Sequence, residues 1–283
     1  MEGTSVRRLE DRDIDDAIAL TDLEAWGYTR ADFHRLLALS PSGSFVAEIE
    51  GRVVGCLTTT SHDGLAFLGA VIVRPELRGK GVGQTMMEAA LRYLASSGVR
   101  TVRLYAYLRA IPFYERLGFH GEYEVVRWDG TAEVGRIHGI RPIRRDDLPA
   151  IARMDAAFFG ANRLRLLGRL SEEFSSTFLV AESRGRIRGF IVGSPSEDAC
   201  EVGPWVVEPG DEPVAVDLFR ALVAAAGVSE IAFSGPTTNE ALKEFVQARQ
   251  FREVFRALRM WWRSNDFAGD PRGVWGLAGL EKG

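Results

Sequence analysis

The sequence predicts an α/β protein built from two tandem copies of one unit, each a mixed, mostly antiparallel, twisted sheet flanked by helices. Two observations support this fold class: an internal repeat, and the same alternation of strand and helix patterns in both halves. Three pairs of segments match at a single shift of 134 residues: VRRLEDRDIDDAIAL (6–20) with IRPIRRDDLPAIARM (140–154), VAEIEGRVVG (46–55) with VAESRGRIRG (180–189), and VRP (73–75) with VEP (207–209). Three matches at one spacing indicate homologous units that meet near residues 130–139.

Each unit begins with a basic strand that leads into a helix with an acidic start. Asp13 and Asp147 stand at these starts, where the positive end of a helix favours negative charge. A second helix is expected over 29–39. A strand pair then turns on Glu-Gly-Arg (50–52), or on Arg-Gly-Arg (184–186) in the second unit, because glycine accepts a positive φ at little cost.

The remaining elements of the first unit follow from apolar patterns. LAFLGAVIV (65–73) is almost continuously apolar, which is typical of a strand buried on both faces. Residues 83–97 have apolar side chains at helical spacing, which predicts a helix packed on the core. A strand, a short helix (112–117) and a strand (122–128) close the unit. The expected order is β-α-α-β-β-β-α-β-α-β.

Composition narrows the class of protein. The 283 residues are 46% hydrophobic and 26% charged with a net charge of −4, which fits a soluble globular chain and gives no basic field for nucleic acid or an anionic membrane. No run is long and apolar enough for a transmembrane helix. Cys56 and Cys200 stand apart with no CxxC partner, so we expect buried thiols, no metal site and a cytoplasmic location.

The segment VIVRPELRGKGVGQTMMEA (71–89) carries the clearest chemical signal. An apolar strand is followed by Arg78-Gly-Lys-Gly-Val-Gly83 and then by a helix. Alternating glycines let backbone N–H groups approach a ligand, and a helix start adds free N–H groups and partial positive charge. The pattern indicates an anion site, above all for a pyrophosphate. It matches neither the GxxxxGK[ST] phosphate loop nor the GxGxxG dinucleotide fingerprint.

RGKGVG in this context resembles the Arg/Gln-x-x-Gly-x-Gly acetyl-CoA motif of the GNAT superfamily of N-acetyltransferases. Downstream, PFYERLGF (112–119) resembles the closing motif of that superfamily. The ends ALRMWWR and VWGLAGLEKG resemble the second lobe of its tandem members. The resemblance spans nearly the whole chain and implies domains at 1–132, catalytic and acetyl-CoA-binding, and at 138–283, a degenerate copy.

The resemblance also implies roles for individual residues. The pantetheine arm of acetyl-CoA would enter a gap between the strands 65–73 and 101–106, held by the backbone of Val71, Ile72 and Val73, with an N–H near Ile72 polarising the thioester carbonyl. Tyr114 would be the general acid that protonates the departing thiolate. Tyr107 stands where many members have asparagine. The pyrophosphate would be held by the loop and helix start: Arg78, Gly79, Lys80, Gly81, Val82, Gly83 and Gln84.

The acceptor and the general base are less well defined by the sequence. Glu24 and Trp26 are the candidates for acceptor recognition, and Glu24, His34, His62 and Asp63 are candidates for the base that deprotonates the amine. The acceptor is expected to be the primary amine of a small molecule. Two fused units favour a monomer over a homodimer.

The second unit is predicted to have lost the cofactor site. The matching segment reads PGDEPVAVD (209–217), in which acidic residues replace arginine and lysine and would repel a pyrophosphate. Val246 stands opposite Tyr114. We therefore expect a structural domain that forms one wall of the acceptor cleft. Alternatives to an acetyltransferase are a transferase for a longer acyl-CoA, a non-catalytic acyl-CoA sensor and a purely structural interaction domain.

Overall fold

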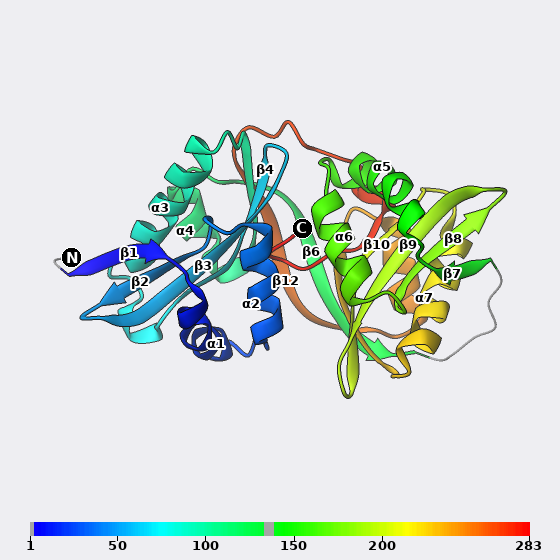
Figure 1. The fold of residues 1–283 in the computed structure, drawn as a ribbon, viewed down its shortest axis with the longest axis horizontal. Helices are drawn as coiled ribbons and strands as arrows, with labels where there is room; N and C mark the ends of the chain where they lie inside the picture. Colours follow the sequence, from blue (N-terminus) through cyan, green and yellow to red (C-terminus); the bar gives the residue numbers. More distant parts are fainter. Residues whose placement is uncertain (1–2, 133–138) are drawn as a thin grey trace.

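The structure is a computed structural model, and it describes residues 3–132 and 139–283. It has two lobes, one from each half of the chain, on either side of a shared central region (Figure 1). The N-terminal half has the element order expected from the sequence: β1 (Thr4–Arg8), α1 (Ile14–Asp22), α2 (Arg30–Leu39), β2 (Phe45–Ile49), β3 (Arg52–His62), β4 (Leu65–Val73), α3 (Val82–Ser96), β5 (Thr101–Tyr107), α4 (Ile111–Arg116) and β6 (His120–Thr131).

The C-terminal half repeats this order and adds one short strand. That strand, β13, follows the last expected element and has no counterpart in the first half. The elements are β7 (Ile140–Pro142), α5 (Leu148–Phe159), α6 (Leu164–Glu173), β8 (Phe178–Ser183), β9 (Arg186–Pro195), β10 (Ala199–Val207), α7 (Glu212–Ala226), β11 (Glu230–Pro236), α8 (Glu240–Ala248), β12 (Arg252–Arg263) and β13 (Val274–Gly276). The predicted repeat is therefore confirmed at the level of secondary structure.

Local sequence accounts for the paired turns of the two halves. Glu50 and Gly51 have φ values of 51° and 75°, and Arg184 and Gly185 have 52° and 72°. Two consecutive positive φ values give the tight turn whose twist suits an antiparallel hairpin. The same Arg–Asp pair also recurs at the start of each half: Arg7 Nη1 lies 2.6 Å from Asp13, and Arg141 Nη1 lies 2.7 Å from Asp147.

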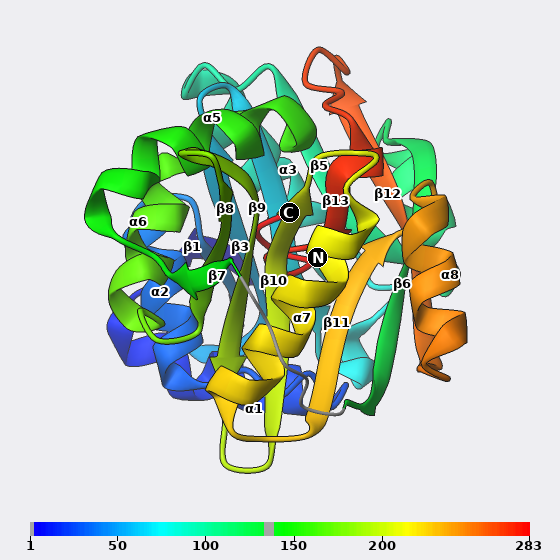
Figure 2. The same ribbon diagram turned by 90° about the vertical axis from the view of Figure 1, so that its right-hand side faces the viewer.

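All but one of the strands lie side by side in a single path, in the order β1-β2-β3-β4-β5-β12-β6-β11-β10-β9-β8-β7, with β13 added on β10. The two halves exchange their last strands. β12, from the second half, pairs with β5 and β6, while β6, from the first half, pairs with β12 and β11. Each half therefore completes its part of the sheet with the last strand of the other half. Orange β12 and green β6 lie between the lobes in Figure 1, and Figure 2 shows these two strands next to each other.

The exchange relates the halves by an approximate two-fold arrangement. Along the order β5-β12-β6-β11, the pair β5 and β6 from the first half corresponds to β11 and β12 from the second. Strand β6 spans 120–131 and β12 spans 252–263, so equivalent positions in these strands differ by 132 residues. A residue of β6 therefore has a structurally equivalent residue in β12, which we call its structural mate, and a substitution at one can serve as the control for a substitution at the other.

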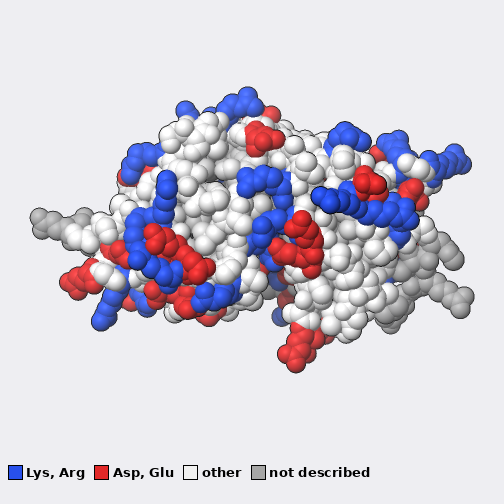
Figure 3. All heavy atoms as spheres, in the orientation of Figure 1, with Lys and Arg blue, Asp and Glu red and all other residues white. Residues whose placement is uncertain are grey.

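Helices cover both faces of the sheet in each lobe. In the first lobe, α3 and α4 pack on one face around Met86, Leu94 and Tyr114, and α1 and α2 pack on the other around Ile14 and Phe33. Equivalent clusters form under α7 and α8, and under α5 and α6. Among the helices in the described part of the chain, none has the length and apolar character needed to span a membrane. Blue and red side chains are interspersed on the face shown in Figure 3.

Candidate active site

The glycine-rich loop between β4 and α3 has the backbone geometry of an open cradle. Gly79 and Gly81 have φ values of 73° and 86°, a region that favours glycine. A Cβ built at either position would have no atom within 4 Å. Glycine is therefore favoured at these two positions by the positive φ and not by close packing. No other part of the described chain covers their backbone, so a ligand could approach it.

Helix α3 begins directly after this loop without a side-chain cap. Its first hydrogen bond runs from the N–H of Thr85 to the carbonyl of Gly81 at 3.0 Å. The N–H groups of Val82, Gly83 and Gln84 come before that bond, and with the helix dipole they give this end of α3 the free donors and partial positive charge that suit an anion. Arg78 Nε donates to the carbonyl of Val73 at 3.0 Å and so fixes the loop to the end of β4, while Lys80 is exposed.

Strands β4 and β5 separate next to this loop. Their parallel pairing covers only Leu65–Phe67 with Thr101–Arg103, although both strands continue. Ala70, with φ of 47°, and a register shift between Cys56 and Thr58 mark a bulge in β4 at the start of the opening. Val71 is the residue of β4 that is not buried. The expected divergence of the two strands is present, with Val71, Ile72 and Val73 along one edge.

Tyr114 lies on α4, in the apolar cluster between α3 and the sheet. Its ring packs edge-on against Phe113 and Phe119, and the side chain is buried. Burial raises the pKa of the Tyr114 phenol, so the hydroxyl keeps its proton at neutral pH. The ring of Phe113 lies close to the start of α3: a Cβ built on Gly83 would lie 3.5 Å from it.

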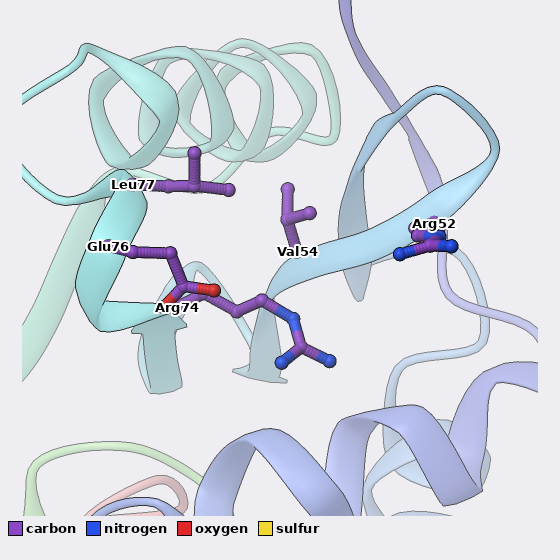
Figure 4. A pocket seen from close by; sticks show the side chains of 5 residues that line it. All are labelled: Arg52, Val54, Arg74, Glu76 and Leu77. Carbon is purple, nitrogen blue, oxygen red and sulfur yellow. The ribbon is translucent and has the colours of Figure 1, made fainter.

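A shallow pocket of about 300 Å³ borders the connection that carries the loop (Figure 4). Its lining comes from β3 and from the residues directly before Arg78: Arg52, Val54, Arg74, Glu76 and Leu77. Two arginines and one glutamate give the lining an excess of positive charge. The sequence analysis did not identify this pocket, since its residues lie on two segments that only the hairpin β3–β4 brings together.

The two candidates for acceptor recognition lie on the opposite face of the sheet, in the turn after α1. The ring of Trp26 lies 6.2 Å from that of Tyr107 at the end of β5. The Glu24 carboxylate is held by two arginines, Arg78 at 2.8 Å and Arg109. Burial alone would raise the pKa of Glu24, but the hydrogen bonds from Arg78 and Arg109 lower it. Glu24 thus joins the glycine-rich loop to this face, which we call the acceptor face after the role predicted for Glu24 and Trp26.

The C-terminal segment 277–283 lies over this same face. Glu281 packs against Gly69, where an added Cβ would lie 2.0 Å from the Cβ of Glu281. Leu277 and Leu280 join a cluster with Tyr105 and Tyr107. The C-terminal segment of the second half therefore packs directly against this face of the first half.

The other three candidate bases lie in different surroundings. His62 is buried, with Nε2 3.3 Å from the carbonyl of Lys282, and burial together with Arg163 lowers its pKa to about 3. His34 is exposed, with Nε2 3.1 Å from Asp11. Asp63 is exposed in the β3–β4 turn. A neutral, enclosed His62 has the surroundings of a packing residue.

The equivalent place in the second half has a different structure. Asp211, at the start of α7, accepts from Arg188 Nε at 2.8 Å, and Glu208 lies 3.3 Å from Arg188 Nη2. Strands β10 and β11 also pair over only four residues, but β13 fills the space beyond. The N–H of Leu277, just after β13, donates to the carbonyl of Ser234 on β11 at 2.8 Å.

Two buried arginines on the acceptor face were not identified from the sequence. Arg103 lies on β5 and Arg259 on β12, and both are buried. The sequence TVRLYAY (101–107) contained a signal for Arg103. Val102, Leu104 and Ala106 alternate there with Arg103, Tyr105 and Tyr107, which places the arginine and the two tyrosines on one face of the strand. The strand exchange that brings Arg259 to Arg103 was not visible in the pattern.

The described residues contain no group of three or more histidine, cysteine or acidic side chains placed to hold a metal ion. Cys56 and Cys200 are both free and buried, and burial raises the pKa of each thiol to about 12. Neither thiol has the surroundings of a reactive nucleophile.

Comparison with known families defines the class of protein. Residues 12–119 match the Acetyltransferase (GNAT) family, and residues 151–276 match an Acetyltransferase (GNAT) domain. The chain belongs to the GNAT family of acetyltransferases, with two of its domains in tandem, and is a transferase of the acyl-transfer class.

Individual relatives agree with this class. Holothin acyltransferase of Pseudoalteromonas sp. (strain SANK 73390) is 25% identical over 265 residues, which cover 92% of this chain and 88% of that protein. Mycothiol acetyltransferase of Streptomyces avermitilis is 33% identical over 116 residues, 39% of this chain. The aligned part is only 32% of that protein's length.

Solved structures share the fold. A putative acetyltransferase from Pyrococcus horikoshii aligns with a TM-score of 0.85 at 21% identity, covering 100% of this chain and 97% of that one. A tandem GNAT protein from the clavulanic acid biosynthesis pathway aligns with a TM-score of 0.62 at 15% identity, covering 91% of this chain and 98% of that one.

Proposed function

We propose that this protein transfers the acetyl group of acetyl-CoA to the primary amine of a small molecule, at a single site in the N-terminal half. The observation that carries the proposal is the difference between two equivalent gaps. The gap between β4 and β5 lies beside a glycine loop with an open backbone, whereas the gap between β10 and β11 is filled by β13. The unit 1–132 would be catalytic, and the unit 138–283 would form a wall of the acceptor cleft.

Several features of the first gap support the binding of acetyl-CoA there. The N–H groups from Gly79 to Gln84 would hold the pyrophosphate, with Arg78 and Lys80 adding positive charge. The backbone of Val71, Ile72 and Val73 would bind the pantetheine amides. When bound, acetyl-CoA supplies an activated thioester. An N–H near Ile72 would stabilise the negative charge that develops on its carbonyl oxygen.

Tyr114 would then complete the transfer. The amine nitrogen bonds to the acetyl carbon and the carbon–sulfur bond breaks. The Tyr114 hydroxyl donates its proton to the departing sulfur, and the proton that the amine loses returns to the phenolate through solvent. The raised pKa of Tyr114 keeps this hydroxyl protonated before the reaction. Trp26 and Glu24 would contact the acceptor from the turn after α1.

Further parts of the proposal concern the surroundings of the enzyme. The chain would act as a monomer, because β6 and β12 already pair the two halves within one chain. It would act in the cytoplasm, where free thiols such as Cys56 and Cys200 persist. It would need no metal, and neither nucleic acid nor a membrane would be a partner.

Calorimetric titration with acetyl-CoA tests the proposal. We expect one site per chain, abolished in Gly81→Glu, which places a carboxylate in the cradle. Gly210→Glu is the matched control, because Gly210 has a φ of 93°, precedes α7 and has nothing within 4 Å of a built Cβ. It should leave binding unchanged. Two sites would contradict the loss of the second site, and no binding would contradict the function.

A second candidate is transfer of a longer acyl group. It is favoured by the relative that covers 92% of this chain, which is named as an acyltransferase rather than as an acetyltransferase. Comparing kcat/KM for acetyl-CoA and butyryl-CoA with one amine distinguishes the two candidates.

A further inference from the structure

Two arginine side chains are buried on the acceptor face of the sheet, beside one carboxylate. Arg103 on β5 is 0% exposed and Arg259 on β12 is 4% exposed. Arg259 lies directly opposite Tyr105, two residues after Arg103, so all three side chains point to the same face. Arg103 Nε lies 3.9 Å and Arg259 Nε 2.8 Å from the same oxygen of Glu122.

The charges in this cluster do not balance. Glu122 is the only carboxylate in the described part of the chain within 4.0 Å of either guanidinium, so two positive charges face one negative charge and the excess is one. Burial and the neighbouring Arg259 lower the pKa of Arg103 to about 10, which still leaves it charged at neutral pH. An uncompensated charge is costly to keep in a protein interior unless a partner of opposite sign binds.

The hydrogen-bond donors of the pair are also incompletely used. Arg103 Nη2 donates to Asn265 at 2.6 Å and Arg259 Nη1 donates to Tyr123. Four other buried nitrogens have no aligned acceptor among the described residues: Arg103 Nε, Arg103 Nη1, Arg259 Nε and Arg259 Nη2. Although Glu122 is close enough to Arg259 for an ion pair, its Oε2 is likewise not aligned for a hydrogen bond.

The structural mate of Arg259 has a guanidinium group that is fully paired with a carboxylate. That mate is Arg127, 132 residues earlier on β6. Both oxygens of Glu201 accept from Arg127, at 2.9 and 2.7 Å. No such two-point partner faces Arg259 in the described chain, where a bulge between the pairs Leu258–Glu124 and Met260–Gly121 sets Glu122 and Tyr123 against it.

The position of the pair connects it to the proposed reaction. Arg103 lies opposite Phe67 in the last residue pair before β4 and β5 separate. From there the acceptor face continues along β5 to Tyr105 and Tyr107, next to Trp26. Tyr105 and Tyr123 pack with Leu277 and Leu280, which exclude water and so strengthen charge pairing.

We propose that Arg103 and Arg259 bind a carboxylate of the acceptor, so that the acceptor is a primary amine that also carries a carboxylate. The inference rests on the proposed function. A carboxylate supplies the one negative charge that the cluster lacks and two oxygens for its free donors, which is the geometry that guanidinium groups bind best. A phosphate dianion would exceed the excess charge of one.

The first test measures binding without catalysis. Sodium propionate, compared with sodium chloride at equal ionic strength, should raise the Tm of the wild-type protein by roughly 2 °C or more. Arg103→Met and Arg259→Met should lose this rise, and the control Arg127→Met should keep it. An equal rise in all variants, no rise in the wild type, or a rise with inorganic phosphate only would overturn the inference. If a methionine variant does not fold, Arg103→Lys and Arg259→Lys should show a smaller rise in Tm than the wild type. Lysine keeps the positive charge but cannot donate the two parallel hydrogen bonds of a guanidinium group.

The second test compares kcat/KM for 4-aminobutyrate and propylamine, which differ in the carboxylate. We expect the wild type and Arg127→Met to prefer 4-aminobutyrate by about tenfold or more, and Arg259→Met to lose the preference. Equal rates for both amines in the wild type would overturn this inference while leaving the proposed function intact. Propionate binding in a protein that acetylates no amine would uphold the carboxylate site and contradict the proposed function.

Discussion

The guanidinium of Arg78 donates a 2.8 Å hydrogen bond to the carboxylate of Glu24, and this bond joins the glycine-rich loop to the turn after α1. Arg109 binds the other oxygen of Glu24. The two substrates of the proposed reaction would therefore meet on either side of one carboxylate, with Glu24 shared between the loop and the acceptor face.

Glu24→Gln should weaken acetyl-CoA binding several-fold while changing the free energy of unfolding by less than about 1 kcal/mol, because both arginine partners are largely exposed. The loop would lose one of its two anchors and keep the bond from Arg78 to Val73. Calorimetry with acetyl-CoA and urea unfolding measure the two effects. Asp22→Asn, an exposed charge on α1, is the control. Equal acetyl-CoA affinity in Glu24→Gln and the wild type would show that the loop does not depend on this contact.

Tyr114→Phe should lower kcat by about 10²–10⁴-fold and leave acetyl-CoA affinity nearly unchanged, since only the proton donor is removed and the ring still packs against Phe119. Single-turnover kinetics and calorimetry measure the two quantities. Tyr93→Phe, in the last turn of α3, controls for loss of a phenol. An unchanged kcat would remove Tyr114 from the mechanism. A wild-type protein that binds acetyl-CoA without turning it over on a broad set of amines would fit the sensor alternative instead.

His62 should make the protein less stable as the pH falls from 7 to 5. Its pKa is lowered to about 3 in the folded state, so protons bind preferentially to the unfolded state once the pH falls below about 6.5. The stability that neutral His62 contributes is present above that pH and declines by about 1.4 kcal/mol per pH unit at most. Urea unfolding at pH 7 and pH 5 should show a smaller difference in His62→Gln than in the wild type. The exposed His34 provides the comparison, and His34→Gln should retain the wild-type difference.

Amide hydrogen exchange should distinguish the two gaps. The amides of β13 and Leu277 should be protected from exchange without any ligand, because the N–H of Leu277 is hydrogen-bonded to the carbonyl of Ser234. Addition of acetyl-CoA should slow exchange at Gly79–Gln84 and leave residues 210–214 unaffected. Ligand-dependent protection in both segments would indicate that the second half binds acetyl-CoA as well.

Short-range features of this fold were predictable from sequence because they depend on neighbouring residues. Local backbone preference explains the turns at Gly51 and Gly185 and the loop at Gly79 and Gly81. A continuous apolar run explains the strand 65–73. The exchange of β6 and β12 was not predictable, since both strands have similar patterns and either could pair with β5. The choice depends on contacts between residues more than a hundred positions apart.

The candidate site divides in the same way. Its cofactor side lies on one continuous stretch, so the motif at 78–84 could be located from the sequence. Its acceptor side combines Trp26, Arg103, Arg259 and the segment 277–283, and only the sheet order places these together. β13 likewise fills the second gap from a segment with no repeat partner, so the repeat alone could not assign it a place.

The exchanged strands also set the order in which the protein can be completed during translation. Strand β6 ends at residue 131 and β12 begins at residue 252, so at ordinary synthesis rates roughly 6–25 s separate the two. Until β12 is made, β5 and β6 lack the strand that lies between them in the folded protein, and an unpaired strand edge can associate with a wrong neighbour. We therefore expect the first half to reach its final sheet only after β12 of the second half has been made.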